Sequence, residues 1–183
     1  MSLTAHKFYG LNGIGLLLKR RNLALEPLIH GGESTTIYRS GTPTVALASS
    51  LALALELAVE QLPQHRDAVR KANAFLRAEL SRYPKVRINS PENAIPQILN
   101  LSVQDVKGTV FQRALDEKGV CVSVKSACSS DGMPSRAVFA VSRDRRNALS
   151  SWRISLSHLT TEEDLQGFLA AFDACYRELT ETH

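Results

Sequence analysis

The chain has 183 residues, of which 44% are hydrophobic and 22% are charged. These values are ordinary for a soluble globular protein and allow one good core. No run of about 18 apolar residues occurs, so the sequence predicts no membrane span. The net charge of +4 is mildly basic, and four arginines cluster between residues 136 and 146. Few aromatic residues lie among them, which favours a solvated face or a contact for an acidic protein over a nucleic-acid site.

The three cysteines are Cys121, Cys128 and Cys175. Their number is odd and their spacing does not match that of metal ligands, so we expect neither a disulfide framework nor a structural metal. This pattern indicates a reducing compartment, and no signal peptide is visible. We therefore expect a cytoplasmic protein.

The first stretch is rich in glycine, with Gly10, Gly13 and Gly15 placed for tight turns. Residues 14–18 follow as a predicted buried strand. Residues 1–3 show no pattern and are interpreted as an expression leader. The dense motif that begins at Thr4 suggests a fragment, with residues 4–42 a remnant of a larger domain.

Thr42 and Pro43 are suited to the N-cap and first position of a helix. Residues 44–62 are apolar on nearly all sides, which predicts a buried helix, and residues 43–62 are interpreted as a linker between domains. Pro63 either kinks this helix or begins a second one. The second segment, to about residue 83, carries one apolar stripe made of Val69, Ala72, Leu76 and Leu80.

From residue 63 on, helices alternate with strands. Alternating apolar residues predict strands at 86–88, 97–103, 120–124 and 152–156. Helical spacing predicts helices at 106–118, with Val110, Phe111, Ala114 and Leu115 inward, at 135–141, and after a capping box at 160–163. The expected fold is α/β, with a small α+β domain over residues 63–183 that has a mixed sheet and helices mainly on one face.

One cysteine, Cys128, lies in a loop of small and polar residues, 124–132. No large apolar residue lies within three positions of it, whereas Cys175 lies in an apolar run. The pattern favours a thiol that solvent and other molecules can reach.

Several stretches, taken together and in this order, resemble the C-terminal half of a cysteine desulfurase of the kind that supplies sulfur for iron–sulfur clusters. They are residues 4–10, 30–32 with 39–42, 126–129, 150–156 and 160–163. The resemblance implies the class-V aminotransferase fold and the cofactor pyridoxal 5'-phosphate. It covers essentially the whole chain.

The resemblance also assigns the cofactor site. Lys7 would hold the cofactor as a Schiff base and move protons, for which its amine must be neutral. Thr4 and His6 would hold the cofactor phosphate, together with Thr42 donated from a neighbouring subunit. We therefore expect a homodimer.

The substrate implied is L-cysteine. Arg153 would bind its carboxylate, while the strand neighbours Trp152 and Ile154 point the other way into the core. Cys128 would attack the substrate sulfur and become a persulfide as alanine is released. The persulfide would then pass to a sulfur-acceptor or scaffold protein.

The chain also departs from the family pattern. Leu11 and Asn12 stand where Pro and a basic residue are usual, and His158 stands where an arginine is more common. The N-terminal part that supplies the partner of the cofactor ring is absent, so we expect the chain alone to bind cofactor poorly and to have little activity.

Three alternatives remain open at this level. The first is a related enzyme of the same fold, such as a selenocysteine lyase, although the Cys128 loop favours a desulfurase. The second is a module without catalytic activity that docks acceptor proteins. The third is that apolar surface on residues 8–60, exposed by truncation, drives self-association.

Overall fold

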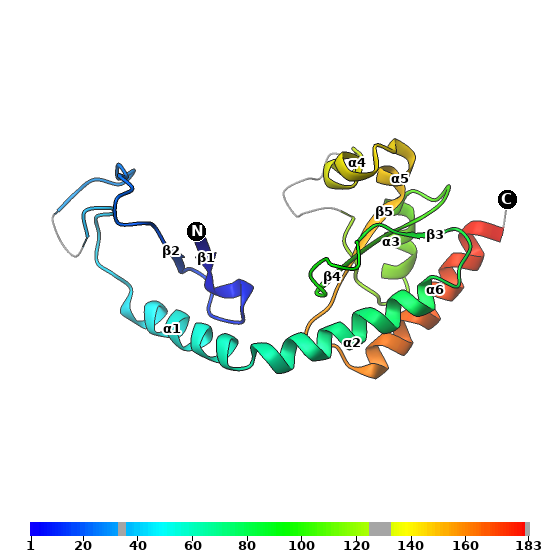
Figure 1. The fold of residues 1–183 in the computed structure, drawn as a ribbon, viewed down its shortest axis with the longest axis horizontal. Coiled ribbons are helices and arrows are strands. Elements are labelled where there is room, and N and C mark those ends of the chain that lie inside the picture. The colour runs from blue at the N-terminus through cyan, green and yellow to red at the C-terminus, as the bar shows by residue number, and fades with distance from the viewer. Residues whose placement is uncertain (33–35, 125–132, 182–183) are drawn as a thin grey trace. The chain divides into compact units, whose positions relative to one another are not determined.

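The computed structural model describes residues 1–32, 36–124 and 133–181. The chain divides into two compact units, which we call unit 1 (Met1–Pro63) and unit 2 (Gln64–His183). Figure 1 shows the elements of each unit along the chain. The expected α/β fold class is confirmed by small sheets combined with helices.

Unit 1 begins with a two-stranded antiparallel sheet. Strand β1 (Ser2–Thr4) pairs with β2 (Gly15–Leu17), with Ser2 opposite Leu17. The expected leader residues 2 and 3 thus take part in a sheet. The predicted strand at 14–18 is present, but the prediction that it is buried is wrong, because Leu17 and Leu18 are exposed.

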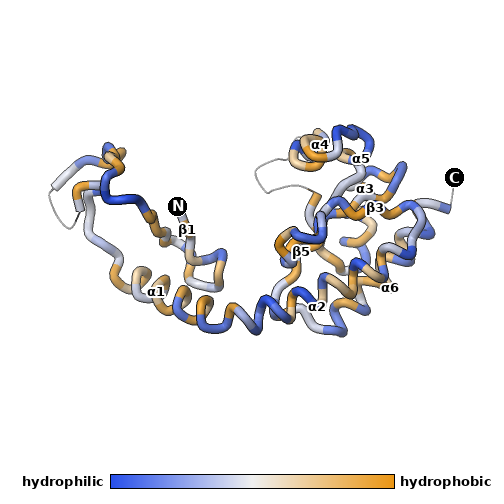
Figure 2. Tube along the Cα trace, in the orientation of Figure 1, coloured by the Kyte–Doolittle hydropathy of each residue, from blue (hydrophilic) through white to orange (hydrophobic). Residues whose placement is uncertain are grey.

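Helix α1 (Val45–Glu60) is the main element of unit 1. It begins two residues later than the predicted cap: its N-cap is Thr44, and Thr42 lies exposed before it. The helix was expected to be buried, yet only Leu51 is buried, and hydrophobic residues recur along its length (Figure 2). A helix that is apolar on all sides is buried only when other elements pack against several of its sides. In unit 1 the turn at Gly10 packs against α1 at Ala54.

Helix α2 (Leu62–Leu80) follows directly. Pro63 lies in the first turn of α2. Of the two predicted alternatives, it therefore begins a second helix and does not kink the first one. The predicted apolar stripe is confirmed, because Val69, Ala72, Leu76 and Leu80 are all buried. Of the helices in the described ranges, none is long and apolar enough to cross a bilayer alone; only α1 and α2 taken together, as one broken segment, pass that test.

The sheet of unit 2 has the strand order β3-β4-β5, formed by β3 (Val86–Ile88), β4 (Ile98–Val103) and β5 (Ser151–Ser155). Both pairings are antiparallel, so the expected mixed sheet is not found among the described residues. The prediction of a strand at 120–124 is also wrong, because in the described part of the chain this segment forms only one antiparallel bridge, between Ser123 and Arg153.

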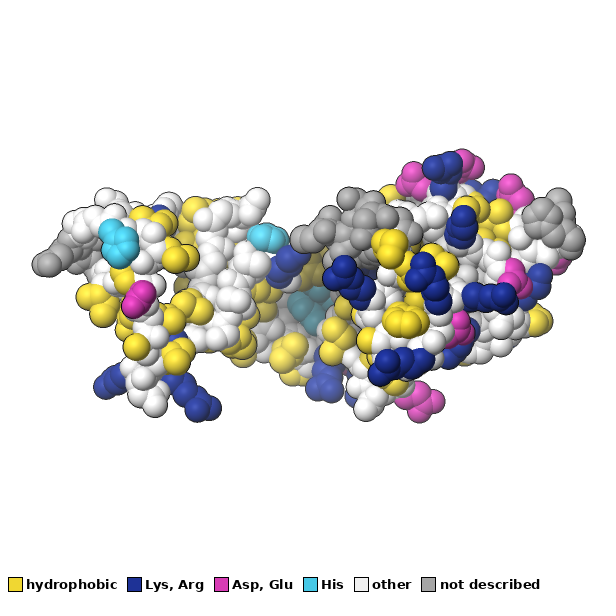
Figure 3. Space-filling model, turned by 90° about the horizontal axis from the view of Figure 1, so that it is seen from above, with side chains coloured by type: hydrophobic (Ala, Val, Ile, Leu, Met, Phe, Trp, Pro, Cys, Tyr) yellow, Lys and Arg dark blue, Asp and Glu magenta, His cyan; other side chains and the backbone are white. Residues whose placement is uncertain are grey.

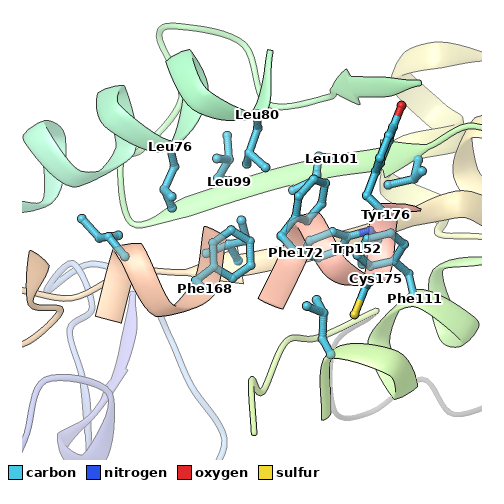
Figure 4. Close-up of a cluster of buried hydrophobic side chains, with 14 of the residues drawn as sticks. Leu76, Leu80, Leu99, Leu101, Phe111, Trp152, Phe168, Phe172, Cys175 and Tyr176 are labelled. Atoms are coloured by element: carbon cyan, nitrogen blue, oxygen red, sulfur yellow. The ribbon is translucent and has the colours of Figure 1, made fainter. Parts of the chain in front are cut away.

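One face of this sheet is apolar and carries the core (Figure 4). Leu99 and Leu101 of β4 stand beside Ile154 and Trp152 of β5, and all four are buried. The Trp152 ring stacks on Phe111 at 5.2 Å, and its centroid lies 6.1 Å from that of Phe172. The core therefore joins the sheet to helix α2, to α3 (Gly108–Asp116) and to α6 (Glu162–Glu181).

The remaining helices follow the sequence pattern closely. Helix α3 (Gly108–Asp116) buries Phe111 and Leu115, but Val110, expected to face inward, is exposed. Helix α4 (Arg136–Ser142) matches the short helix predicted at 135–141, and α5 (Arg145–Ser150) was not predicted. In α6 (Glu162–Glu181) the capping box is made by Thr161 and Asp164, whose side chains accept hydrogen bonds from each other's backbone N–H.

Candidate functional site

The stretch with Thr4, His6 and Lys7 forms a tight turn in unit 1. Residues Ala5–Lys7 form the short 3-10 helix η1, in which Ala5 is fully buried. The carbonyl of Ala5 accepts hydrogen bonds from the N–H groups of Phe8 and Gly10, at 3.0 and 2.9 Å. A Cβ atom on Gly10 would lie 2.8 Å from that of Ala5, so only glycine closes this turn. The backbone that carries Lys7 is therefore fixed locally.

The side chains of this turn supply three kinds of polar group. The Thr4 hydroxyl lies 3.1 Å from His6 Nδ1, and the His6 and Lys7 side chains are exposed. A hydroxyl and an imidazole suit a phosphate, and an amine suits an aldehyde, so this donor set fits pyridoxal phosphate. Thr42 belongs to the same unit and is exposed. Unit 1 thus brings Thr4 and His6 into contact, with Lys7 next to them in the chain.

Arg153 lies in unit 2, on the sheet face opposite the core. Its neighbours Trp152 and Ile154 are buried in the core, as predicted, and Arg153 itself is half-buried. Across the strand pair it stands opposite Asn100, and on its other side its backbone bonds to Ser123. Strand β4 on one side and the bridge to Ser123 on the other therefore hold the backbone of Arg153 in position.

The guanidinium of Arg153 has a donor with no partner in the described part of the chain. Its Nε is buried and has no hydrogen-bond partner among the described residues. Trp152 Nε1 is in the same condition, but it is a neutral group enclosed in the core. A buried unpartnered donor of a cation is costly, and a carboxylate is the ligand that would satisfy it.

A network of polar side chains lies beside Arg153, and sequence reasoning missed it. Asn89 Nδ2 donates to Asn100 Oδ1 at 2.9 Å and to Ser102 Oγ at 2.8 Å, and Asn89 Oδ1 accepts from Asn147 Nδ2 at 2.9 Å. Ser102 Oγ in turn donates to the Asn147 carbonyl. The network ties β3, β4 and α5 together. Its signal in the sequence is Asn100 and Ser102, polar residues that alternate with Leu99 and Leu101.

The expected nucleophile Cys128 lies outside the described residues. The segment before it is anchored, since Val122 and Val124 are partly buried against the core. The other two cysteines are free: Cys121 is exposed, and Cys175 is buried, which raises the pKa of its thiol. Among the described cysteines, burial thus disfavours a reactive thiolate at Cys175.

His158, where the family pattern more often has arginine, stacks on His65. The two rings are nearly parallel, with their centroids 3.6 Å apart. His158 follows β5 and His65 lies in α2, so the stack joins these elements within unit 2. Burial, and next the charge of His65, lower the pKa of His158 below its ordinary value of 6.5.

Replacing Asn89 by Ala should lower the free energy of unfolding of unit 2 by about 2–3 kcal/mol, because it leaves Asn100, Ser102 and Asn147 with unsatisfied groups. The measurement is urea unfolding followed by the fluorescence of Trp152, the one tryptophan of the chain. The matched control is Asn93→Ala, at an exposed position, which should cost under about 0.5 kcal/mol. Equal losses in the two variants would contradict the network.

Lowering the pH through 6.5 should destabilise unit 2. The folded chain keeps His158 neutral where the unfolded chain protonates it, so the unfolded state binds more protons in this range. The contribution of His158 to the free energy of unfolding is complete above about pH 6.5 and decreases as the pH falls below that value. It stops decreasing below the lowered pKa of the folded state. His158→Phe keeps an aromatic ring on His65 and should weaken the pH dependence of the urea midpoint. A variant as pH-dependent as the wild type would refute this assignment, and His30→Gln, at an exposed histidine of unit 1, serves as the control.

Comparison with known proteins agrees with the family resemblance. The model of the aminotransferase class-V family matches residues 1–168. Cysteine desulfurase IscS of Dictyoglomus turgidum is 35% identical over 182 residues, which cover 98% of this chain and 46% of that protein. An IscS-like cysteine desulfurase of Mycobacterium tuberculosis is 32% identical over 92% of this chain and 44% of its own length.

Solved structures give the same result. A NifS-like protein of Rickettsia africae superposes with a TM-score of 0.84 at 27% identity, covering 96% of this chain and 46% of that one. A second NifS-like protein superposes with a TM-score of 0.83 at 31% identity, covering 98% and 46%. The chain thus spans about half the length of the proteins it matches. With the match to residues 1–168, the chain belongs to the class-V aminotransferase family.

Proposed function

We propose that this chain forms the C-terminal half of a cysteine desulfurase, which takes sulfur from L-cysteine and releases alanine. The relatives named cysteine desulfurase, which match nearly the whole chain, support this proposal. The observation that carries it is the Arg153 guanidinium, which lies on the polar face of the sheet with Nε buried and without a partner among the residues that the structure describes. That group suits the carboxylate of an amino acid.

The cofactor of the proposed enzyme is pyridoxal 5'-phosphate. Lys7 would hold its aldehyde carbon, and Thr4 and His6 would hold its phosphate, together with Thr42 from a second copy of the chain. When bound, the cofactor supplies an electron sink that weakens the bond between carbon and sulfur in the substrate. Lys7 then has a second task, which is to move the proton at the substrate α-carbon.

The proposed nucleophile is Cys128. Its thiolate attacks the substrate sulfur, so that a sulfur–sulfur bond forms as the carbon–sulfur bond breaks, and Cys128 retains the sulfur as a persulfide. A sulfur-acceptor or scaffold protein then takes it up for iron–sulfur cluster assembly. The location we propose is a reducing, cytoplasmic one, because the cysteines of the sequence are odd in number and lack the spacing of metal ligands.

Cys128→Ala should abolish sulfide release while cofactor binding persists. The chain is co-expressed with the part of Dictyoglomus turgidum cysteine desulfurase IscS that it does not match, and assembly is confirmed by the absorbance of bound cofactor. With L-cysteine and a reductant, the variant should release sulfide about a thousandfold more slowly than the wild type, because the attacking sulfur is gone.

The matched control is Cys121→Ala, which removes an exposed thiol from the same unit. It should keep sulfide release within about twofold, as expected for a surface change away from the chemistry. An assembled Cys128→Ala complex that releases sulfide at the wild-type rate would rule out the proposed nucleophile.

A further inference from the structure

The segment formed by α4 and α5 exposes side chains that the fold of unit 2 does not use. Helix α4 contains no buried residue, Val141 is 84% exposed and Phe139 is 42% exposed. Four exposed arginines flank these two apolar side chains in sequence. We call the six residues the arginine face: Arg136, Phe139, Val141, Arg143, Arg145 and Arg146.

The acids in the described part of the chain do not neutralise the charge of the arginine face. Within the described ranges, none of its four arginines forms a salt bridge. The one acid between them, Asp144, is occupied twice: it accepts a hydrogen bond from the Asn147 N–H at 3.0 Å and pairs with Arg87 at 3.5 Å. Like charges that the fold leaves unpaired attract a partner of opposite charge.

Two exposed apolar side chains, Phe139 and Val141, accompany the arginines in α4. Seen from above, unit 2 shows hydrophobic side chains among Lys and Arg, with some Asp and Glu (Figure 3). An apolar patch bordered by polar groups is typical of a protein–protein contact, and arginine is enriched in such contacts because it pairs with carboxylates in two hydrogen bonds.

We propose that the arginine face binds a protein whose contact surface is acidic and carries an exposed apolar side chain. The acids pair with the arginines, and the apolar side chain covers Val141, the more exposed of the two apolar residues. A nucleic acid fits less well, because Phe139 is the one aromatic ring of the face and single strands are held by successive stacked bases. The inference goes beyond the proposed enzymatic function, since binding requires no catalytic step.

The test uses the full chain and a fluorescein-labelled peptide of eight glutamates around one central leucine, at low salt. A peptide without the leucine and a single-stranded RNA of equal charge are the comparison probes, and binding is measured by fluorescence anisotropy. We expect the leucine peptide to bind most tightly of the three. Reversing two charges with R145E/R146E should weaken its binding about tenfold or more, and Val141→Ser should remove the advantage of the leucine.

These variants separate binding from folding. Arg145 and Arg146 open α5, where glutamate suits the positive end of the helix, so R145E/R146E should fold normally. Native fluorescence of Trp152 checks this in each sample. The charge-matched control is R66E/R70E, at exposed positions of α2, which should leave binding unchanged.

Three results would overturn the proposal. The first is that the leucine peptide does not bind, or binds no better than the peptide without leucine. The second is an equal loss of binding in R66E/R70E, which would show attraction to net charge only. The third is tighter binding of the RNA, which would make the arginine face a nucleic-acid site.

Discussion

The alternation of β4 and β5 between two faces of one sheet is the constraint on which unit 2 depends. Leu99 and Leu101 face the helices, whereas Asn100 and Ser102 face the other way. In β5 the same alternation places Trp152 in the core and Arg153 on the polar face. A slip of one residue would exchange these two side chains, burying a cation among the rings of Phe111 and Phe172. Packing of the core therefore fixes the position of the candidate binding group.

The polar face is held as firmly as the apolar one. Asn89 contacts groups on β4 and α5 through three hydrogen bonds, and Asp144 caps α5 from the turn before it. These bonds satisfy polar groups that the sheet would otherwise bury without partners. Rigidity beside Arg153 means that the backbone carrying the guanidinium is fixed before a carboxylate binds, which lowers the entropic cost of binding.

The strongly periodic parts of the sequence predicted unit 2 well. The stripe of α2, the strands β3, β4 and β5 and the helix α6 were all found, because each buries one face against a common core. Two predictions failed because they assumed a packing or pairing partner that the sequence does not show. The apolar sequence of α1 gives no information on what covers it, so its burial was predicted wrongly. Residues 120–124 alternate like a strand, yet pair only at Ser123.

The candidate site was predictable in part. The contact of Thr4 with His6 and the outward direction of Arg153 follow from a short turn and a strand, whose geometry is local. The roles of Lys7, Thr42 and Cys128 stay predictions. The network at Asn89 was missed because its members are far apart in the sequence and only the folded sheet brings them together.

The central claim is that Arg153 offers an unused donor to a carboxylate, and NMR of arginine side chains tests it directly. The probe is L-alanine, the product of the proposed reaction. It is titrated into the chain assembled with the part of Dictyoglomus turgidum cysteine desulfurase IscS that the chain does not match, while the Nε–H signals are followed. The Arg153 signal should shift with saturation, whereas that of Arg77, whose Nε already donates to Asn73 at 2.7 Å, should not move. An unchanged Arg153 signal, or equal shifts of both, would contradict the account.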